Sequence, residues 1–193
     1  MHKLILASSS PRRSMLLSQV GIPYEIRVPE VDESQVRFDS PESLVKGLAR
    51  YKGLNTKLRD DWEVILSADT VVAYQNQILE KPQDQQDAIQ MLKKLSGRQH
   101  EVYTGVMLRT KKEERVFVEK TTVEFRDLND QEINRYVWTK DPMDKAGAYG
   151  IQSGGAVFVK GIFGDYYNVV GLPVARVVKE LERYSIFPFS SGA

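Results

Sequence analysis

Residues 8–13 (SSSPRR) join three hydroxyl groups, a proline and two guanidinium groups directly after a short apolar segment, residues 4–7. Hydroxyl and guanidinium groups bind phosphate oxygens well, and a helix start adds outward-pointing N–H groups and about half a positive charge. Ser10 is suited to cap such a helix, and Pro11 fits its first turn. The segment therefore predicts a site for a phosphorylated ligand. An ordinary helix start with two solvated arginines is the alternative, and so short a motif does not separate the two.

Asp69 and Lys81 are two further candidates for chemistry. Asp69 follows the apolar segment Val64–Ala68 and precedes Thr70, so we expect its carboxylate at the end of a strand. A carboxylate there can bind a metal ion or act as a base, although a turn-forming aspartate is the simpler interpretation of this residue alone. Lys81 precedes a proline at the end of a hairpin strand, where it could reach a phosphate or be an ordinary edge-strand lysine.

An acidic loop and a helical lysine complete the set. Residues 29–34 (PEVDES) place Glu30, Asp32 and Glu33 close together after a strand. Three carboxylates can hold a hard divalent cation, or they can form a solvated acidic loop. Lys52 lies three residues after Ala49 in a predicted helix, which puts it at the edge of the buried face or in solvent.

Composition limits the classes of protein. The chain has 193 residues, 41% of them hydrophobic, and a formal charge of +1 from 27 basic and 26 acidic residues. This near balance makes nucleic acid an improbable partner. The lack of cysteine excludes disulfides and thiolate metal sites and fits a reducing compartment. We see no secretory signal and no apolar run of about 18 residues, so we expect a cytoplasmic protein without a membrane span. A homodimer is possible, because dimers are common.

The sequence lacks the motifs of several common catalytic and nucleotide-binding mechanisms. The sequence has no GxxxxGK[ST] and no GxGxxG after a strand, and Ser153 is wrongly placed for a GxSxG elbow. With only His2 and His100, a histidine-rich zinc site cannot form. The remaining combination of cations and strand-end carboxylates suits metal-assisted phosphoryl or nucleotidyl chemistry.

The elements that position these residues alternate between strand and helix. Hairpins interrupt the alternation, which favours a mixed α/β sheet flanked by helices over an all-parallel one. We expect one domain over residues 1–186, with two lobes around a cleft, and a C-terminal tail at 187–193. A glycine-rich segment at 144–155 is a functional or structural loop. Strands are expected at 4–7, 24–28, 64–68, 71–74, 78–80, 101–109, 115–125 and 157–160, and helices at 11–20, 40–57, 84–95, 129–137 and 173–184.

Six motifs in order and at family spacing resemble the Maf family, part of the inosine-triphosphatase-like superfamily of nucleotide pyrophosphatases. They are LASSSPRR, EVDES, SADT, EKP, DKAGAYGIQ and VVGLP, and the resemblance runs from Lys3 to about Tyr184. It implies a long, mixed, twisted sheet with a deep cleft between two lobes. It also implies cleavage of a nucleoside triphosphate to a monophosphate and pyrophosphate.

The resemblance also implies roles for individual residues. Asp69 matches the base that activates water, and Glu33 with Asp69 matches the site of Mg²⁺ or Mn²⁺. The branch of the family that prefers dTTP and UTP is matched at three positions, whereas the 7-methyl-GTP branch has a tryptophan at the position of Arg12. A glutamine amide offers both a donor and an acceptor to a uracil or thymine edge. The phosphate ligands implied are Ser8, Arg13, Lys52 and Lys81, and the three branch positions are Arg12, Thr70 and Gln152.

Two other functions fit the sequence. A non-catalytic nucleotide-binding regulator is one, because the family takes its name from an effect on septum formation. A phosphohydrolase that releases inorganic phosphate is the other. Identification of the reaction products separates both from a pyrophosphatase.

Overall fold

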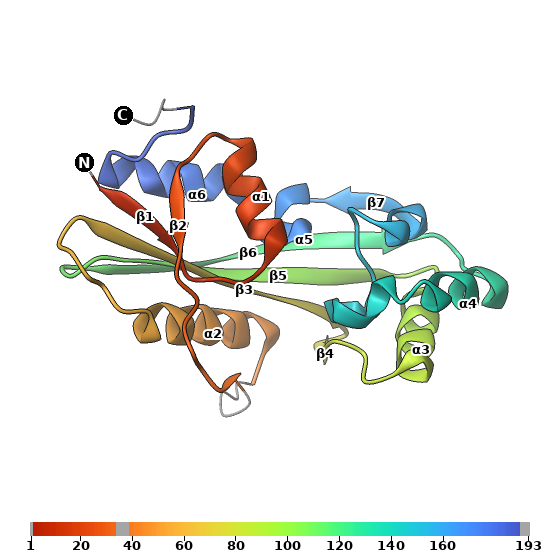
Figure 1. Cartoon of the computed structure of the whole chain (residues 1–193). Helices are drawn as coiled ribbons and strands as arrows, with labels where there is room; N and C mark the ends of the chain where they lie inside the picture. Colours follow the sequence, from red (N-terminus) through yellow and green to blue (C-terminus); the bar gives the residue numbers. More distant parts are fainter. Residues whose placement is uncertain (1, 34–38, 190–193) are drawn as a thin grey trace.

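One mixed sheet organises the computed structural model, which describes residues 2–33 and 39–189 (Figure 1). In this part of the chain seven strands pair in the order β2-β1-β3-β5-β6-β7, and β4 pairs with β3. β1 is parallel to both of its neighbours, and all other pairs are antiparallel. The predicted mixed α/β sheet is therefore confirmed. The strands are β1 (Lys3–Leu6), β2 (Tyr24–Ile26), β3 (Glu63–Tyr74), β4 (Gln77–Leu79), β5 (Gln99–Arg109), β6 (Glu114–Phe125) and β7 (Val159–Phe163).

Helices cover both faces of the sheet. In Figure 1, α2 lies on one side of the strands, α1, α5 and α6 lie on the other, and α3 and α4 gather at the far end. Within the described residues, no helix has the length and apolar character that crossing a membrane requires. The α-helices are α1 (Pro11–Gln19), α2 (Pro41–Asn55), α3 (Gln85–Leu95), α4 (Asp130–Trp138), α5 (Tyr166–Val170) and α6 (Val174–Leu181), and the 3₁₀ helices are η2 (Asp141–Asp144), η3 (Ala146–Ala148), η4 (Gly154–Phe158) and η5 (Glu182–Tyr184).

Two large hydrophobic clusters form the core. One packs β1, β3 and β5 against α1 and α6, with Leu4, Leu16 and Val177 among its buried members. The other packs the opposite end of the sheet against α3 and α4, through residues such as Leu92 and Phe125. Burial of this apolar surface is the main force that holds each cluster together. The two clusters are the physical basis of the two predicted lobes.

The central strands are longer than the sequence predicted. A strand end after Ala68 is wrong, because β3 continues to Tyr74 and pairs with β5 from Ile65 to Ala73. Asp69 therefore lies in mid-strand, opposite Gly105. Residues 69 and 70 are both polar, and this local pattern is typical of a turn. The long hydrogen-bonded pairing of β3 with β5 outweighs that local preference.

Three other local predictions need correction. Ser10 is the N-cap residue before α1, but its side chain makes no capping hydrogen bond, so the first N–H groups of the helix are left for another partner. The strand predicted at 157–160 begins only at Val159, because residues 154–158 form a 3₁₀ helix. The last helix ends at Leu181 and continues as η5. In the predicted tail, the Phe189 amide donates to the Val20 carbonyl at 3.1 Å, and residues 190–193 lie outside the described part.

A glycine lets α2 lie close against the sheet. A Cβ on Gly105 of β5 would lie 2.2 Å from the Val45 carbonyl oxygen of α2, so no larger residue fits there without moving the helix. Ser67 of β3 fixes the same contact by donating to the Ala49 carbonyl at 2.7 Å. These two contacts hold α2 close enough to the sheet for Lys52, in the last turn of the helix, to reach β3.

A buried histidine lies in the second cluster. His100 of β5 is 1% exposed, and its Nε2 lies 2.9 Å from the Tyr149 hydroxyl. Its ring meets those of Phe125 and Tyr149 edge to face. Burial lowers the pKa of His100 from 6.5 to about 4, because the charged imidazolium would lose its hydration. The folded protein therefore keeps this ring neutral at pH values where the unfolded chain protonates it.

We expect His100 to make the fold sensitive to mild acid. Between pH 6.5 and 4 the unfolded state binds the additional proton, so the free energy of unfolding falls as the pH falls. From pH 7 to pH 5, this one group should cost about 2 kcal/mol, and His100→Gln should remove that part of the loss. Urea unfolding of both proteins at the two pH values measures the difference. Identical pH dependence in wild type and variant would contradict the assignment.

Candidate functional site

A cavity of about 780 Å³ opens between the two lobes, and its wall includes the nine residues predicted to bind substrate or metal or to act in catalysis, whereas Glu30 and Asp32 of the acidic loop are not among its lining residues. These residues come from the β1–α1 turn, the acidic loop before α2, the end of α2, the middle of β3, the segment after β4 and the glycine-rich segment. The structure thus brings together side chains that are up to 144 positions apart in the chain, from Ser8 to Gln152. The set is Ser8, Arg12, Arg13, Glu33, Lys52, Asp69, Thr70, Lys81 and Gln152.

Arg13 is the most constrained of these side chains. It is only 8% exposed, and three different segments accept its hydrogen bonds. Nε donates to the Gly171 carbonyl at 2.9 Å, Nη1 to the Ser8 hydroxyl at 3.1 Å, and Nη2 to the Thr70 hydroxyl at 3.2 Å. Burial lowers the pKa of the guanidinium, while the nearby charge of Asp69 raises it. Of its five N–H groups, one on each Nη keeps no partner among the described residues and is left for a ligand.

The hydroxyl of Thr70 is held by a neighbour that the sequence did not indicate. Thr104, fully buried on β5, faces Thr70 across the ladder, and the two hydroxyl oxygens are 2.9 Å apart. Thr104 donates to the Asn168 carbonyl at 3.2 Å, and the single hydroxyl proton of Thr70 can go to Thr104 or to the Gly171 carbonyl at 3.4 Å. The lone pairs of Thr70 are then free to accept from Arg13. Thr70 therefore helps to fix the guanidinium of Arg13.

Lys52 is paired with both predicted metal ligands. Its Nζ lies 2.6 Å from Asp69 and 3.0 Å from Glu33, and the Lys52 and Asp69 side chains are 14% and 13% exposed. Because one ammonium group reaches both carboxylates, the two lie close enough to share a cation. Among the described residues, no group of three or more acidic, histidine or cysteine side chains could hold a metal ion. A three-carboxylate site in the acidic loop is therefore not formed by its described residues.

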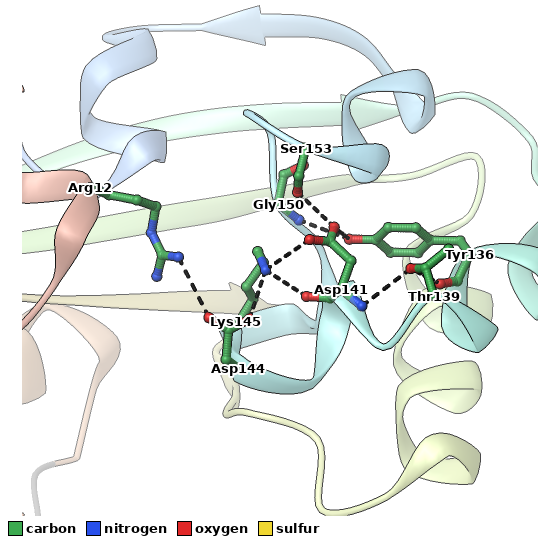
Figure 2. A network of polar contacts seen from close by, with 8 residues as sticks. All are labelled: Arg12, Tyr136, Thr139, Asp141, Asp144, Lys145, Gly150 and Ser153. Carbon is green, nitrogen blue, oxygen red and sulfur yellow. Dashed lines mark hydrogen bonds and ion pairs between the residues drawn. The ribbon is translucent and has the colours of Figure 1, made fainter. Parts of the chain in front are cut away.

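The other predicted residues lie at the wall of the cavity with less fixed side chains. Arg12 points across the cavity, and its Nη1 lies 3.8 Å from an Asp144 oxygen (Figure 2). Lys81 is exposed beside Glu80, and Gln152 is exposed in the turn between Gly150 and Ser153. Neither Lys81 nor Gln152 makes a side-chain hydrogen bond within the described residues, so both are available to a ligand.

A polar network that no sequence pattern predicted surrounds the glycine-rich segment, as Figure 2 shows. Lys145 donates to Asp141 at 3.1 Å and to Asp144 at 2.6 Å. The other oxygen of Asp141 accepts from Tyr136 at 2.7 Å and from Ser153 at 2.6 Å. The pairs of Lys145 are local, whereas the contact between Tyr136 and Asp141 has no local signal because it forms only when α4 packs beside η2. The segment was predicted only to be a functional or structural loop.

The chemistry that this cavity supports follows from its charges. Cationic side chains, two facing carboxylates and the uncapped start of α1 surround one space, and together they suit an extended anion carried with a hard divalent cation. Its volume lies in the range of small-molecule sites. The arrangement therefore favours a nucleotide with several phosphates over a single small anion.

Known proteins are similar to this chain over nearly its whole length. The model of the family described as Maf-like protein matches residues 3–184. The dTTP/UTP pyrophosphatase of Bacillus cereus (strain G9842) is 48% identical over 186 residues, covering 96% of this chain and 97% of the relative. The dTTP/UTP pyrophosphatase of Bacillus cytotoxicus is also 48% identical, over 193 residues, covering 100% of this chain and 98% of the relative.

A solved HAM1 protein from Coxiella burnetii aligns with a TM-score of 0.47 and 14% identity, covering 95% of this chain and all of that chain. The family match and the curated relatives each extend over nearly the whole sequence. The chain therefore belongs to the Maf family.

Proposed function

We propose that this protein hydrolyses dTTP and UTP to the nucleoside monophosphate and pyrophosphate. The observation that carries the proposal is the shared cavity: nine residues chosen from sequence line one space. Curated relatives that carry the name dTTP/UTP pyrophosphatase are 48% identical over nearly the full chain, which supports the same reaction here.

The β1–α1 turn binds the phosphates in this proposal. Arg13 is already oriented by three hydrogen bonds, so little conformational entropy is lost when its two remaining N–H groups meet phosphate oxygens. The hydroxyl of Ser8 and the uncapped N–H groups of α1 add donors of the same kind. Lys81 contributes a mobile positive charge from the other side of the cavity.

Glu33 and Asp69 hold the divalent cation. Their oxygen-only donor set fits Mg²⁺ or Mn²⁺, and these ions commonly complete their coordination with water and substrate phosphates. When bound, such an ion neutralises phosphate charge and polarises the phosphoryl group.

Asp69 is the proposed general base, which orients a water molecule and accepts its proton. Its mid-strand position gives it a rigid backbone on both sides, as a positioned base requires. Lys52 lies 2.6 Å from Asp69, where its charge also stabilises the phosphates as pyrophosphate leaves.

Arg12, Thr70 and Gln152 set the choice of nucleotide in this proposal. Gln152 presents an amide to the edge of the base, and Arg12 reaches over the same cavity. Thr70 acts through Arg13, because its hydroxyl accepts from that guanidinium and fixes its orientation.

Product identification tests the reaction. Purified protein with Mg²⁺ should convert UTP and dTTP to monophosphate and pyrophosphate, and should act less on CTP, GTP and 7-methyl-GTP. Inorganic phosphate as the product would replace the proposal with a different phosphohydrolase. Nucleotide binding without turnover would favour the non-catalytic regulator.

Asp69→Asn should lower the rate of pyrophosphate release from UTP by roughly 10²–10⁴-fold, because it removes the base and keeps the size of the side chain. A coupled pyrophosphate assay measures the rate. Asp61→Asn is the control, because Asp61 pairs with Lys111 on the surface, with a side chain 78% exposed. Turnover close to wild type in Asp69→Asn would reject the role.

Lys52→Met should increase the affinity for Mg²⁺ in the absence of nucleotide, by about fivefold, because it removes a positive charge from between two carboxylates. Isothermal titration with MgCl₂ measures this. The control is Lys93→Met, which removes an exposed ion pair with Asp130 away from the cavity. Unchanged or weaker Mg²⁺ binding in Lys52→Met would place the cation elsewhere.

A further inference from the structure

The turn that carries Gln152 is held at both ends by one carboxylate oxygen. Oδ2 of Asp141 accepts the Ser153 hydroxyl at 2.6 Å and the Tyr136 hydroxyl at 2.7 Å. Tyr136 in turn accepts the backbone N–H of Gly150 at 3.1 Å. Gln152 lies between these two fixed points and at the wall of the cavity (Figure 2 shows the network).

Close packing restricts the same turn. A Cβ on Gly150 would lie 2.3 Å from the Ser153 hydroxyl, and one on Gly154 would lie 2.9 Å from the Tyr136 ring. Tyr136 itself is buried at 7% exposure and meets Phe158 edge to face at 5.0 Å. Tyr136, which holds one end of the turn, is therefore part of the second hydrophobic cluster. The turn has little room to move relative to this cluster.

The network also extends to Arg12. The other oxygen of Asp141 accepts from Lys145, Lys145 donates to Asp144, and Asp144 faces Arg12 across the cavity. Two of the three residues that we propose to select the nucleotide are thus linked through the same carboxylate. Figure 2 shows this line of contacts from Arg12 to Tyr136.

A glutamine amide does not by itself distinguish uracil from cytosine. Uracil offers an acceptor and an N–H donor where cytosine offers an amino donor and an acceptor, and an amide can rotate to serve either pattern. Discrimination therefore requires that the surroundings fix where the amide lies. Tyr136 and Asp141, which bond to the two ends of the turn, supply this constraint.

We propose that Tyr136 and Asp141 are positioning residues that give the site its preference for uracil and thymine, by fixing the turn that carries Gln152. This inference rests on the proposed function in two respects, the preference for uracil and thymine and the assignment of Gln152 as the residue that contacts the base. Neither side chain needs to touch the substrate, because both act through the backbone and hydroxyl groups at the ends of the turn.

Binding of UMP and CMP tests the inference without requiring hydrolysis. Isothermal titration should give wild type a lower Kd for UMP than for CMP. Tyr136→Phe removes one hydroxyl, so UMP should bind about tenfold more weakly while CMP changes little. The matched control is Tyr149→Phe, which removes a similarly buried hydroxyl next to the turn, bonded to His100 instead, and should keep the wild-type ratio.

Ser153 provides a second test if Tyr136→Phe is poorly folded. Ser153→Ala should reduce the UMP preference in the same way, and Ser153→Thr should restore it, because threonine keeps the hydroxyl. Retention of the wild-type ratio in both Tyr136→Phe and Ser153→Ala, or an equal loss for UMP and CMP, would overturn the inference.

Failure of the proposed function gives a different result. If wild type releases no pyrophosphate from UTP, the reaction is wrong, and the UMP-to-CMP ratio of the variants still decides the role of Tyr136 and Asp141. If wild type hydrolyses UTP but binds UMP and CMP equally, the reaction stands and the positioning role is rejected.

Discussion

The buried guanidinium of Arg13 is the interaction on which the site depends. A charge at 8% exposure is costly unless hydrogen bonds compensate it, and here the partners come from the turn after β1, from β3 and from the segment after α5. These segments are distant in sequence and come together only in the folded sheet. The requirement to satisfy one buried charge therefore also brings the phosphate-binding turn to β3 and to the segment after α5.

Two lysines of the cavity are paired with carboxylates in the same way. Lys52 is held by Glu33 and Asp69, and Lys145 is held by Asp141 and Asp144. Each ammonium group thus lies beside two carboxylates, and the positive charges of Arg12, Arg13 and Lys81 offset the excess negative charge of these groups and of Glu80. A polyphosphate bound with a divalent cation offers new partners to both kinds of group, which explains how so many charges are tolerated in one cavity.

Local motifs made much of this structure predictable. The mixed sheet follows from the order of short-range strand and helix patterns, and the structure confirms it. The predicted site residues line one cavity, which local patterns alone did not require. Their individual roles stay predictions until the variants are measured.

The features that the sequence did not reveal are those that arise from long-range pairing. Asp69 resembles a turn residue locally, and only the ladder with β5 places it in mid-strand. Thr104 is an ordinary strand threonine until Thr70 faces it, and Asp141 becomes a fixed point only when α4 lies beside η2. In each case the deciding partner lies on another segment, where no periodicity or capping signal points to it.

The most direct test of this account is the binding of inorganic tripolyphosphate with Mg²⁺ to Arg13→Lys. Lysine keeps the positive charge but loses the planar fork that meets Ser8, Thr70 and the ligand together. We predict a cooperatively folded variant whose affinity, measured by isothermal titration, is at least about tenfold weaker than that of wild type. Wild-type affinity in this variant would contradict the view that the buried guanidinium anchors the phosphates.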